Sequence, residues 1–243
     1  MGSLNEIHFT SFNGIVIDND AILDSEVNLN NIYINGKGLF TEDVDAEKFS
    51  VYGEARVKGL LSCDEITVEG TCYCEDSLIS ERITVSGVLE VIGKISSDDI
   101  IVSGNVLSQG DVNVALLDIS GGLSCDKTIS CETAKIQGYV NIKGTLKALD
   151  LFMESADISR IAKISVDNAD VKKNMLSLKQ DIPEFILECG QLDCESAYLE
   201  NCKIGVLLCD DAEIGPGCVI DEIAYRKTLK FHETAKIGKK AIV

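Results

Sequence analysis

The sequence predicts an all-β fold, a single-stranded triangular β-helix in which each coil contributes three short strands. Three observations lead to this prediction. Glycines recur every seventeen residues, apolar residues come in pairs two positions apart, and aromatic residues make up only 5% of the 243 residues. A narrow interior of stacked aliphatic side chains needs few aromatic rings, whereas a compact core of this size usually contains more of them.

A glycine marks one corner of each predicted coil. Seven glycines follow one another at intervals of seventeen residues without an insertion, and apolar residues stand two and four positions before each of them. Residues two positions apart project to the same side of a strand, so each such pair is expected to face the interior. We expect these glycines to adopt positive φ angles at the turn. They are Gly36, Gly53, Gly70, Gly87, Gly104, Gly121 and Gly138.

Two further apolar pairs complete the coil. In the repeat that begins with the pair Phe49/Val51 they are Ala55/Val57 and Leu61/Cys63, so the pairs start six, six and five residues apart. Equivalent residues of successive coils should then stack at about 4.8 Å, the spacing of hydrogen-bonded strands. The pattern extends back to Ile15/Ile17 and forward to Ala148. Seventeen-residue coils are therefore expected over residues 15–148.

The rest of the chain is interpreted as parts of the same continuous domain. Residues 1–14 form a leader or cap, and residues 149–186, with Pro183, form irregular coils and a loop because proline cannot donate a ladder hydrogen bond. From Leu187 the apolar pairs recur every five residues, as in Leu187/Cys189 and Leu192/Cys194. Three such sides give a coil of fifteen residues. Residues 187–243 are therefore predicted to continue the helix with fifteen-residue coils and to end in a C-terminal cap.

Charge and hydropathy limit the partners and the location. The formal net charge of −18 disfavours nucleic acid and anionic membrane surfaces as direct partners. No apolar run approaches the 18 residues of a membrane-spanning helix, and the first residues lack the basic and apolar regions of a signal peptide. A cytoplasmic location without direct membrane insertion is the expectation, and the ten cysteines are interpreted as reduced thiols.

The sequence offers no pattern typical of catalysis or of metal binding, and we predict no enzyme, no cofactor and no metal site. The cysteines have no zinc-ligand spacing and are interpreted as small hydrophobes. The two histidines, His8 and His232, lie near opposite ends of the chain. The phrase IGPGCVI, which begins at Ile214, is similar to a hexapeptide acyltransferase repeat, but the repeat length here is seventeen or fifteen rather than eighteen. The five-residue periodicity resembles that of pentapeptide-repeat proteins, whose coils take twenty residues.

The repeats resemble those of the bactofilins, a bacterial family of polymer-forming cytoskeletal proteins. The passage ITVSGVLEVIGKISSDDIIVSGNVLSQGDV, from Ile83, carries the resemblance most clearly, and the tail from Ile214 is similar to that of the longer members found in Firmicutes. The resemblance implies a right-handed triangular β-helix that polymerises end to end without nucleotide. Such polymers scaffold cell-envelope or cell-shape proteins at the inner face of the membrane. The chain departs from short bactofilins in its greater length and in lacking proline-rich flanks.

The ends of a β-helix favour self-association independently of this resemblance. Each terminal coil exposes unpaired backbone groups and an apolar cross-section, which must be capped or used. We therefore expect the protein itself to be its main partner, as an end-to-end homo-oligomer. An alternative is a monomeric or dimeric β-helix that binds another protein on a flat face. The residues predicted for self-association are Phe9, Phe12, Ile15, Ile17, Phe231 and Ile237, with Lys236, Lys239 and Lys240 as a basic cluster beside the last two.

Overall fold

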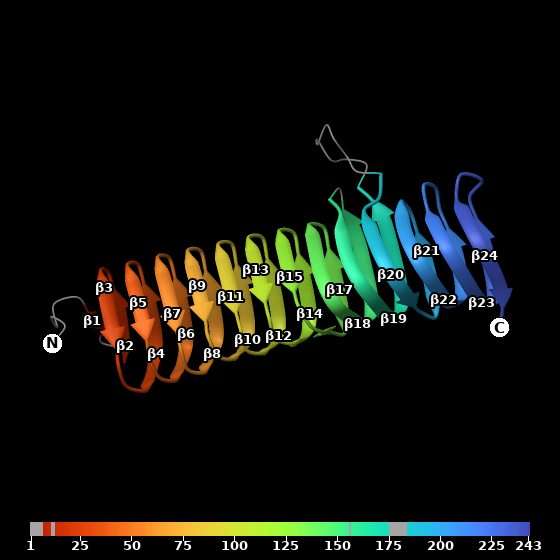
Figure 1. Cartoon of the computed structure of the whole chain (residues 1–243). Helices are drawn as coiled ribbons and strands as arrows, with labels where there is room; N and C mark the ends of the chain where they lie inside the picture. Colours follow the sequence, from red (N-terminus) through yellow and green to blue (C-terminus); the bar gives the residue numbers. More distant parts are fainter. Residues whose placement is uncertain (1–6, 11–12, 156, 175–183) are drawn as a thin grey trace. The chain divides into compact units, whose positions relative to one another are not determined.

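The computed structural model describes residues 7–10, 13–155, 157–174 and 184–243 of the chain. Its regular elements, within those ranges, are all β-strands (Figure 1). The chain divides into two compact units, Met1–Ala115 (unit 1) and Leu116–Val243 (unit 2). Parallel strand pairing builds each unit as a β-helix, so the predicted fold class is confirmed.

Unit 1 repeats a long and a short strand once per coil. Each eight-residue strand bends near its middle and contributes to two faces, and each four-residue strand forms another face. The strands are β1 (Ile7–Thr10), β2 (Gly14–Ile17), β3 (Asp20–Leu23), β4 (Val27–Ile34), β5 (Lys37–Phe40), β6 (Val44–Val51), β7 (Glu54–Val57), β8 (Leu61–Val68), β9 (Thr71–Cys74), β10 (Leu78–Val85), β11 (Val88–Val91), β12 (Ile95–Val102) and β13 (Asn105–Ser108). Strand β14 (Val112–Ile119) extends over the boundary between the units.

The register follows the seventeen-residue repeat. Val85 in β10 stands between Val68 in β8 and Val102 in β12, one coil away on either side. We number the three faces in chain order. In one coil the first face carries the inward pair Ile83/Val85, the second carries Leu89/Val91, and the third begins with Ile95. These five side chains are buried, so the predicted apolar columns form the core of the unit.

Polar residues in the inward columns satisfy their hydrogen bonds within the coil. Ser80 is 4% exposed, and its hydroxyl lies 3.0 Å from the carbonyl oxygen of Asp64 and 2.9 Å from that of Arg82. Ser97, one coil later, repeats this arrangement with Glu81 and Asp99. Serine is therefore tolerated at the end of the third face because bent backbone there offers acceptors.

The corner glycines do not adopt the positive φ angles expected from the sequence. Among the described glycines, only Gly217 has a positive φ, of 72°. The corner glycines are instead required by a close approach of successive coils. A Cβ atom on Gly70 would lie against the carbonyl oxygen of Gly53, and one on Gly87 would lie against that of Gly70. Glycine recurs because each corner leaves no room for a side chain above the preceding corner.

Unit 2 continues the same architecture with longer strands. It begins with the second half of β14 and contains β15 (Gly122–Cys125), β16 (Ile129–Ser130), β17 (Thr133–Ile136), β18 (Tyr139–Ser155), β19 (Ser159–Lys173), β20 (Leu187–Asp193), β21 (Ser196–Leu199), β22 (Cys202–Ile214), β23 (Val219–Phe231) and β24 (Lys236–Ile242). Successive coils pair in parallel throughout, as in unit 1. The inward pairs of β18 and β19, including Leu151/Met153 and Ala169/Val171, are buried.

Coil length varies within unit 2, and this corrects two predicted boundaries. Strands β18 and β19 pair over Asn141–Ser155, with one shift of register between Ile142 and Thr145. The stretch predicted as irregular from residue 149 is therefore largely regular; residues 175–183 lie outside the described ranges. The fifteen-residue spacing holds between β20 and β22. It lengthens to sixteen at Lys203↔Val219 and to seventeen at Asp211↔Thr228. The prediction that fifteen-residue coils continue to the end is therefore wrong beyond Ile214.

Corner length explains the change in the repeat. In the seventeen-residue coils three residues separate Val51 from Ala55, whereas in the fifteen-residue coils two residues, Glu200 and Asn201, separate Leu199 from Cys202. The corner between the second and third faces shortens in the same way. Each side of the coil then takes five residues, and the inward pairs remain in column.

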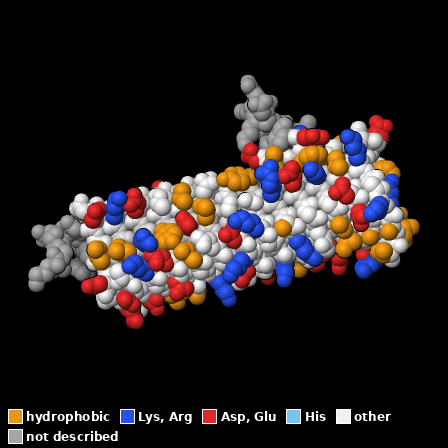
Figure 2. Space-filling view, viewed as in Figure 1, with side chains coloured by type: hydrophobic (Ala, Val, Ile, Leu, Met, Phe, Trp, Pro, Cys, Tyr) orange, Lys and Arg blue, Asp and Glu red, His pale blue; other side chains and the backbone are white. Residues whose placement is uncertain are grey.

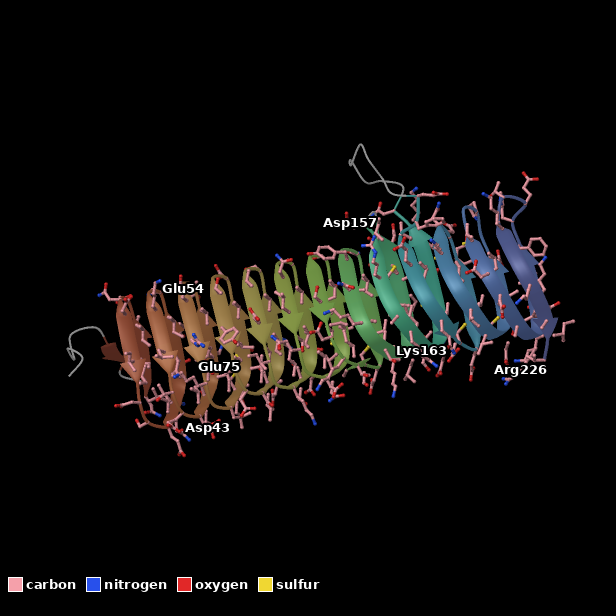
Figure 3. All side chains as sticks on the ribbon, in the orientation of Figure 1. Asp43, Glu54, Glu75, Asp157, Lys163 and Arg226 are labelled. Atoms are coloured by element: carbon pink, nitrogen blue, oxygen red, sulfur yellow. The ribbon has the colours of Figure 1, made fainter. Side chains whose placement is uncertain are left out.

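Charged and amide side chains also stack from coil to coil on the surface. At one corner of unit 1 the charge alternates along the column, with Lys48 3.1 Å from Glu65, and Arg82 3.7 Å from Glu65 and 3.4 Å from Asp99. Glu54, labelled in Figure 3, forms a similar pair with Lys37 at 2.8 Å. Exposed pairs contribute little stability individually. Their alternation nevertheless disfavours a shift of register, because a shift would place like charges together.

Charge in an inward column should unfold unit 1, whereas charge on the adjacent outward position should not. Val85 is fully buried, so Val85→Asp would bury a carboxylate without a partner and cost several kcal/mol, about 3 or more. Thr84→Asp, whose side chain points outward, is the matched control and should change stability by less than about 1 kcal/mol. Urea unfolding of both variants measures the difference, and equal losses would contradict the assigned register.

A methyl group at a corner should separate two coils. Gly70→Ala should lower the free energy of unfolding by about 1–3 kcal/mol, because the backbone of Gly53 must move to admit the new Cβ atom. The control Glu69→Ala changes the exposed neighbour in the same corner and should be close to neutral. Thermal unfolding of the two variants would test this, and a neutral Gly70→Ala would show that the corner has space for a side chain.

Candidate self-association surfaces

The N-terminal coil, residues 13–30, is covered on its first face by the leader strand. Strand β1 pairs antiparallel with β2, with Ile7 opposite Ile17 and Phe9 opposite Ile15. Because β2 also pairs with β4, both of its edges are occupied. Ile15 and Ile17 are 1% and 0% exposed. These two residues, predicted for self-association, therefore belong to the core while β1 is in place.

The second and third faces of this coil are more open. Strand β3 pairs with β5, and residues Val27–Leu29 of β4 pair with β6, whereas within the described ranges no strand pairs with their other edges. Ile22, which points outward from β3, is 68% exposed. Phe12 lies outside the described residues. Among the described residues, the leader strand thus covers one face of the coil, and the backbone edges of the other two faces have no partner strand.

The C-terminal coil, residues 226–243, presents apolar side chains and one unpaired edge. Strand β24 pairs with β23 alone within the described residues. Phe231 is 50% exposed and Ile242 is 74% exposed, while Ile237 is half-buried. Figure 2 shows hydrophobic and basic side chains gathered at this end of unit 2. The predicted residues Phe231 and Ile237 therefore both belong to the accessible C-terminal coil.

Lys240 occupies an inward position of this coil. It stands opposite Ile223, a buried core residue of the preceding coil, but its own side chain is exposed. Its Nζ lies 3.9 Å from the centre of the Phe231 ring, at the distance of a cation–π contact. A cation at the end of an apolar column makes this cross-section both apolar and positively charged.

The two terminal coils carry opposite charge. The N-terminal coil contains four carboxylates and no lysine or arginine, and all four are exposed: Asp18, Asp20, Asp24 and Glu26. The C-terminal coil contains one carboxylate, Glu233, and six basic residues, all exposed: Arg226, Lys227, Lys230, Lys236, Lys239 and Lys240. In a chain of net charge −18, such a basic coil is unusual.

Part of the basic charge is paired with the preceding coil. Arg226, labelled in Figure 3, lies 3.1 Å from Asp210, and Lys227 lies 3.0 Å from the same carboxylate. Hydrogen bonds from Lys227 and Arg226 lower the pKa of Asp210. Lys239 donates to Glu222 one coil before it, and this hydrogen bond raises the pKa of Lys239. Basic residues of this coil therefore bind carboxylates of the coil stacked on it.

A shallow groove on the first face of unit 2 is a further candidate site. Its volume is about 350 Å³, and its lining includes Asp170, Tyr198 and Glu213. Asp170 pairs with Lys172 at 2.7 Å, although its Oδ1 atom has no hydrogen-bond partner. Tyr198 donates to Glu200 at 2.5 Å. Side chains that pair with one another in this way are typical of a solvated surface.

Metal-binding groups are not evident in the described part of the chain, which contains no cluster of three or more histidine, cysteine, aspartate or glutamate side chains suited to a metal. His232 lies on the exposed C-terminal coil, with its Nδ1 atom 2.9 Å from the Thr234 hydroxyl. His8 lies in β1, in register with Val16 of β2.

The cysteines are free and mostly part of the core. Eight of the ten are buried, and Cys131 and Cys194 are half-buried. The sulfur atoms of Cys72 and Cys74 lie 3.9 Å apart on the second face, and that of Cys63 lies 3.7 Å from the Ser80 hydroxyl. Burial raises the pKa of the Cys63 and Cys131 thiols to about 12. Protonated thiols of this kind pack as small hydrophobes and are weak nucleophiles.

Comparison with protein-family models, with curated proteins and with solved structures gives no match. Within the described residues, no helical segment has the length and hydropathy needed to cross a lipid bilayer.

Sequence reasoning identified the basic cluster but missed its acidic counterpart. Asp20, Asp24 and Glu26 were not distinguished from the other carboxylates of an acidic chain. A count of charge by coil rather than over the whole chain would have found them. The role of β1 could not be anticipated in the same way, since an antiparallel strand breaks the repeat and leaves no periodic signal.

Buried thiols should make stability depend on alkaline pH. The Cys63 pKa is raised from 9.0 to about 12 in the folded protein, so between these values the unfolded chain has lost a proton that the folded chain retains. The free energy of unfolding should therefore fall as pH rises, by up to about 1.4 kcal/mol per pH unit for this group. Urea unfolding of Cys63→Ala from pH 8.5 to pH 11 should show a shallower decline than wild type; equal slopes would contradict the assignment.

Proposed function

We propose that this protein is a structural scaffold that assembles end to end with copies of itself. One observation carries the proposal: among the described residues, no strand pairs with the outer edge of β24, and the side chains of Phe231 and Ile242 in the same coil are exposed. An unpaired strand edge with apolar neighbours is a template for another chain. Each coil already pairs in parallel with the next, so a second copy can continue the pairing that holds one molecule together.

The resemblance of the repeats to bactofilins supports the same function. Members of that family are nucleotide-independent polymers of the bacterial cytoplasm that organise cell-envelope or cell-shape proteins, and the same role is proposed for this chain. In this proposal the chain has no catalytic role, and any association with the membrane is peripheral and passes through partner proteins. The acidic side faces keep neighbouring polymers apart, since like charges oppose lateral contact.

A second candidate function is a monomeric or dimeric module that binds another protein. Outward apolar side chains on unit 1 favour it, because Ile79, Ile101 and Leu107 are each 41–47% exposed. These residues point from three different faces, however, and so do not form one patch. The leader strand, which covers an edge of the N-terminal coil, is also compatible with this function. End-to-end assembly accounts for more of the described surface.

The assembly can be tested at the apolar end. Negative-stain electron microscopy and sedimentation velocity of the wild type should show elongated oligomers that grow with concentration. Ile242→Ser removes an exposed apolar side chain and should weaken association about 10- to 100-fold, since burying such a side chain contributes about 1.5–3 kcal/mol. The matched control Ile79→Ser makes the same change on a side face and should have no effect.

Each result separates the two candidate functions. Loss of assembly in Ile242→Ser with normal assembly in Ile79→Ser supports the end-to-end scaffold. A wild type that remains monomeric over the whole concentration range contradicts it and favours the protein-binding module. Equal effects of both substitutions would indicate lateral association rather than contact through the ends.

A further inference from the structure

The opposite charges of the two terminal coils point to a defined polarity of assembly. Four exposed carboxylates without a basic residue characterise the N-terminal coil, and six exposed basic residues with one carboxylate characterise the C-terminal coil. Two C-terminal coils placed against each other would bring lysines together, and two N-terminal coils would bring carboxylates together. Contact between unlike coils is therefore electrostatically favoured over contact between like coils.

The backbone edges available on the two coils also correspond. Strand β24 extends along the second and third faces, because Ile237 follows Ile220 of the second face and Ala241 follows Ala224 of the third. The open edges of the N-terminal coil belong to the same two faces, β3 on the second and Val27–Leu29 on the third. One copy can therefore add β24 to β3 and β4 of another copy in the parallel orientation that joins successive coils.

The charges fall at the same corner when the two coils are stacked in this way. Lys239 lies between the second and third faces, where it already binds Glu222 one coil before it. In the N-terminal coil that corner consists of residues 24–26, with Asp24 and Glu26 exposed. Stacking in register would place Lys239 of one copy between Glu222 and these carboxylates. The contact would repeat an ion pair that the chain already makes within itself.

The first face behaves differently because β1 occupies it. A parallel strand from another copy can pair with β2 only if β1 leaves the edge, since β4 holds the other edge. An antiparallel strand of four residues is short, so its displacement by a longer parallel surface is feasible. The leader strand therefore competes with the second copy for one of the three faces.

We propose that assembly is head-to-tail, with the basic C-terminal coil of one copy stacked on the acidic N-terminal coil of the next, and that β1 limits this contact by competing for the first face. The inference rests on the proposed end-to-end function and adds its polarity and its regulation. The resulting polymer has two different ends, and β1 marks one of them.

Charge reversal distinguishes this arrangement from a symmetric one. The first variant carries Asp24→Lys and Glu26→Lys, the second carries Lys236→Glu and Lys239→Glu, and the third carries all four substitutions. Head-to-tail contact predicts that each pair of substitutions weakens association at least tenfold and that the combined variant recovers to within about threefold of wild type, because unlike charges again meet. Sedimentation velocity at low salt measures all four proteins, and thermal unfolding verifies that each is folded.

The control variant Asp64→Lys and Glu81→Lys makes the same change in net charge on a side face of unit 1. It should associate at least as strongly as wild type, whereas the first variant should not. Association of wild type should also weaken as salt rises, because the end contact is between opposite charges. A symmetric contact predicts that neither single pair of substitutions weakens association, and that result would overturn the proposal. A wild type that does not associate at all would overturn the proposed function as well.

The competition by β1 has its own readout. His8→Pro removes a backbone donor from β1 in the full chain and should release the strand, so that association becomes stronger by several-fold. His8→Ala retains the donor and serves as the control. Stronger association in His8→Pro alone supports the competition. Unchanged or weaker association would show that β1 does not compete with the second copy, while the charge-reversal result would still decide the polarity.

Discussion

The parallel backbone ladder between successive coils is the interaction on which the rest of the structure depends. Because each coil hydrogen-bonds to the next in register, a residue such as Val85 always meets its own equivalents, Val68 and Val102. A single position in the repeat therefore decides the content of a whole column. Aliphatic residues and cysteines, together with Phe40 and Phe49, fill most of the inward positions, and glycine fills the corner column where carbonyl oxygens of the coil below leave no space.

The same stacking orders the surface side chains, but a charged side chain cannot be repeated in a column as freely as an apolar one. Identical apolar residues can repeat in a column without cost, whereas identical charges repel their neighbours at the spacing of one coil. Alternation, as at Lys48, Glu65, Arg82 and Asp99, turns this repulsion into attraction. A column can thus fix the register, but only where a next coil exists. Within the described residues, each terminal coil has a neighbouring coil on one side only.

The fold could be predicted from the sequence because seven glycines, from Gly36 to Gly138, follow one another at intervals of seventeen residues, and the chance of such an agreement is negligible. The predicted length of the later coils was less reliable, since a corner gains or loses one residue without disturbing the inward pairs. The positive φ angles predicted for the corner glycines were wrong, and the explanation is different from that for the coil length. A positive φ is a property of one residue, whereas the close approach of Gly53 to Gly70 belongs to two coils and is visible only in the stacked structure.

For the candidate surfaces, the exposed Phe231 was predictable from its place near the end of the pattern, but the burial of Ile15 and Ile17 beneath β1 was not.

The leader strand bears on a general property of solenoids with a constant register. An unpaired parallel edge at the end of such a solenoid can pair with a second copy, and that copy with a third, unless a strand outside the repeat covers the edge. Strand β1 is such a strand, because it pairs with the edge of β2 and runs antiparallel to it. Its own outer edge therefore belongs to a strand of the opposite direction. Its four residues pair along one face of the N-terminal coil only. In the proposed assembly, pairing direction would therefore act on that face and charge on the other two, so that one restrains assembly while the other selects the partner end.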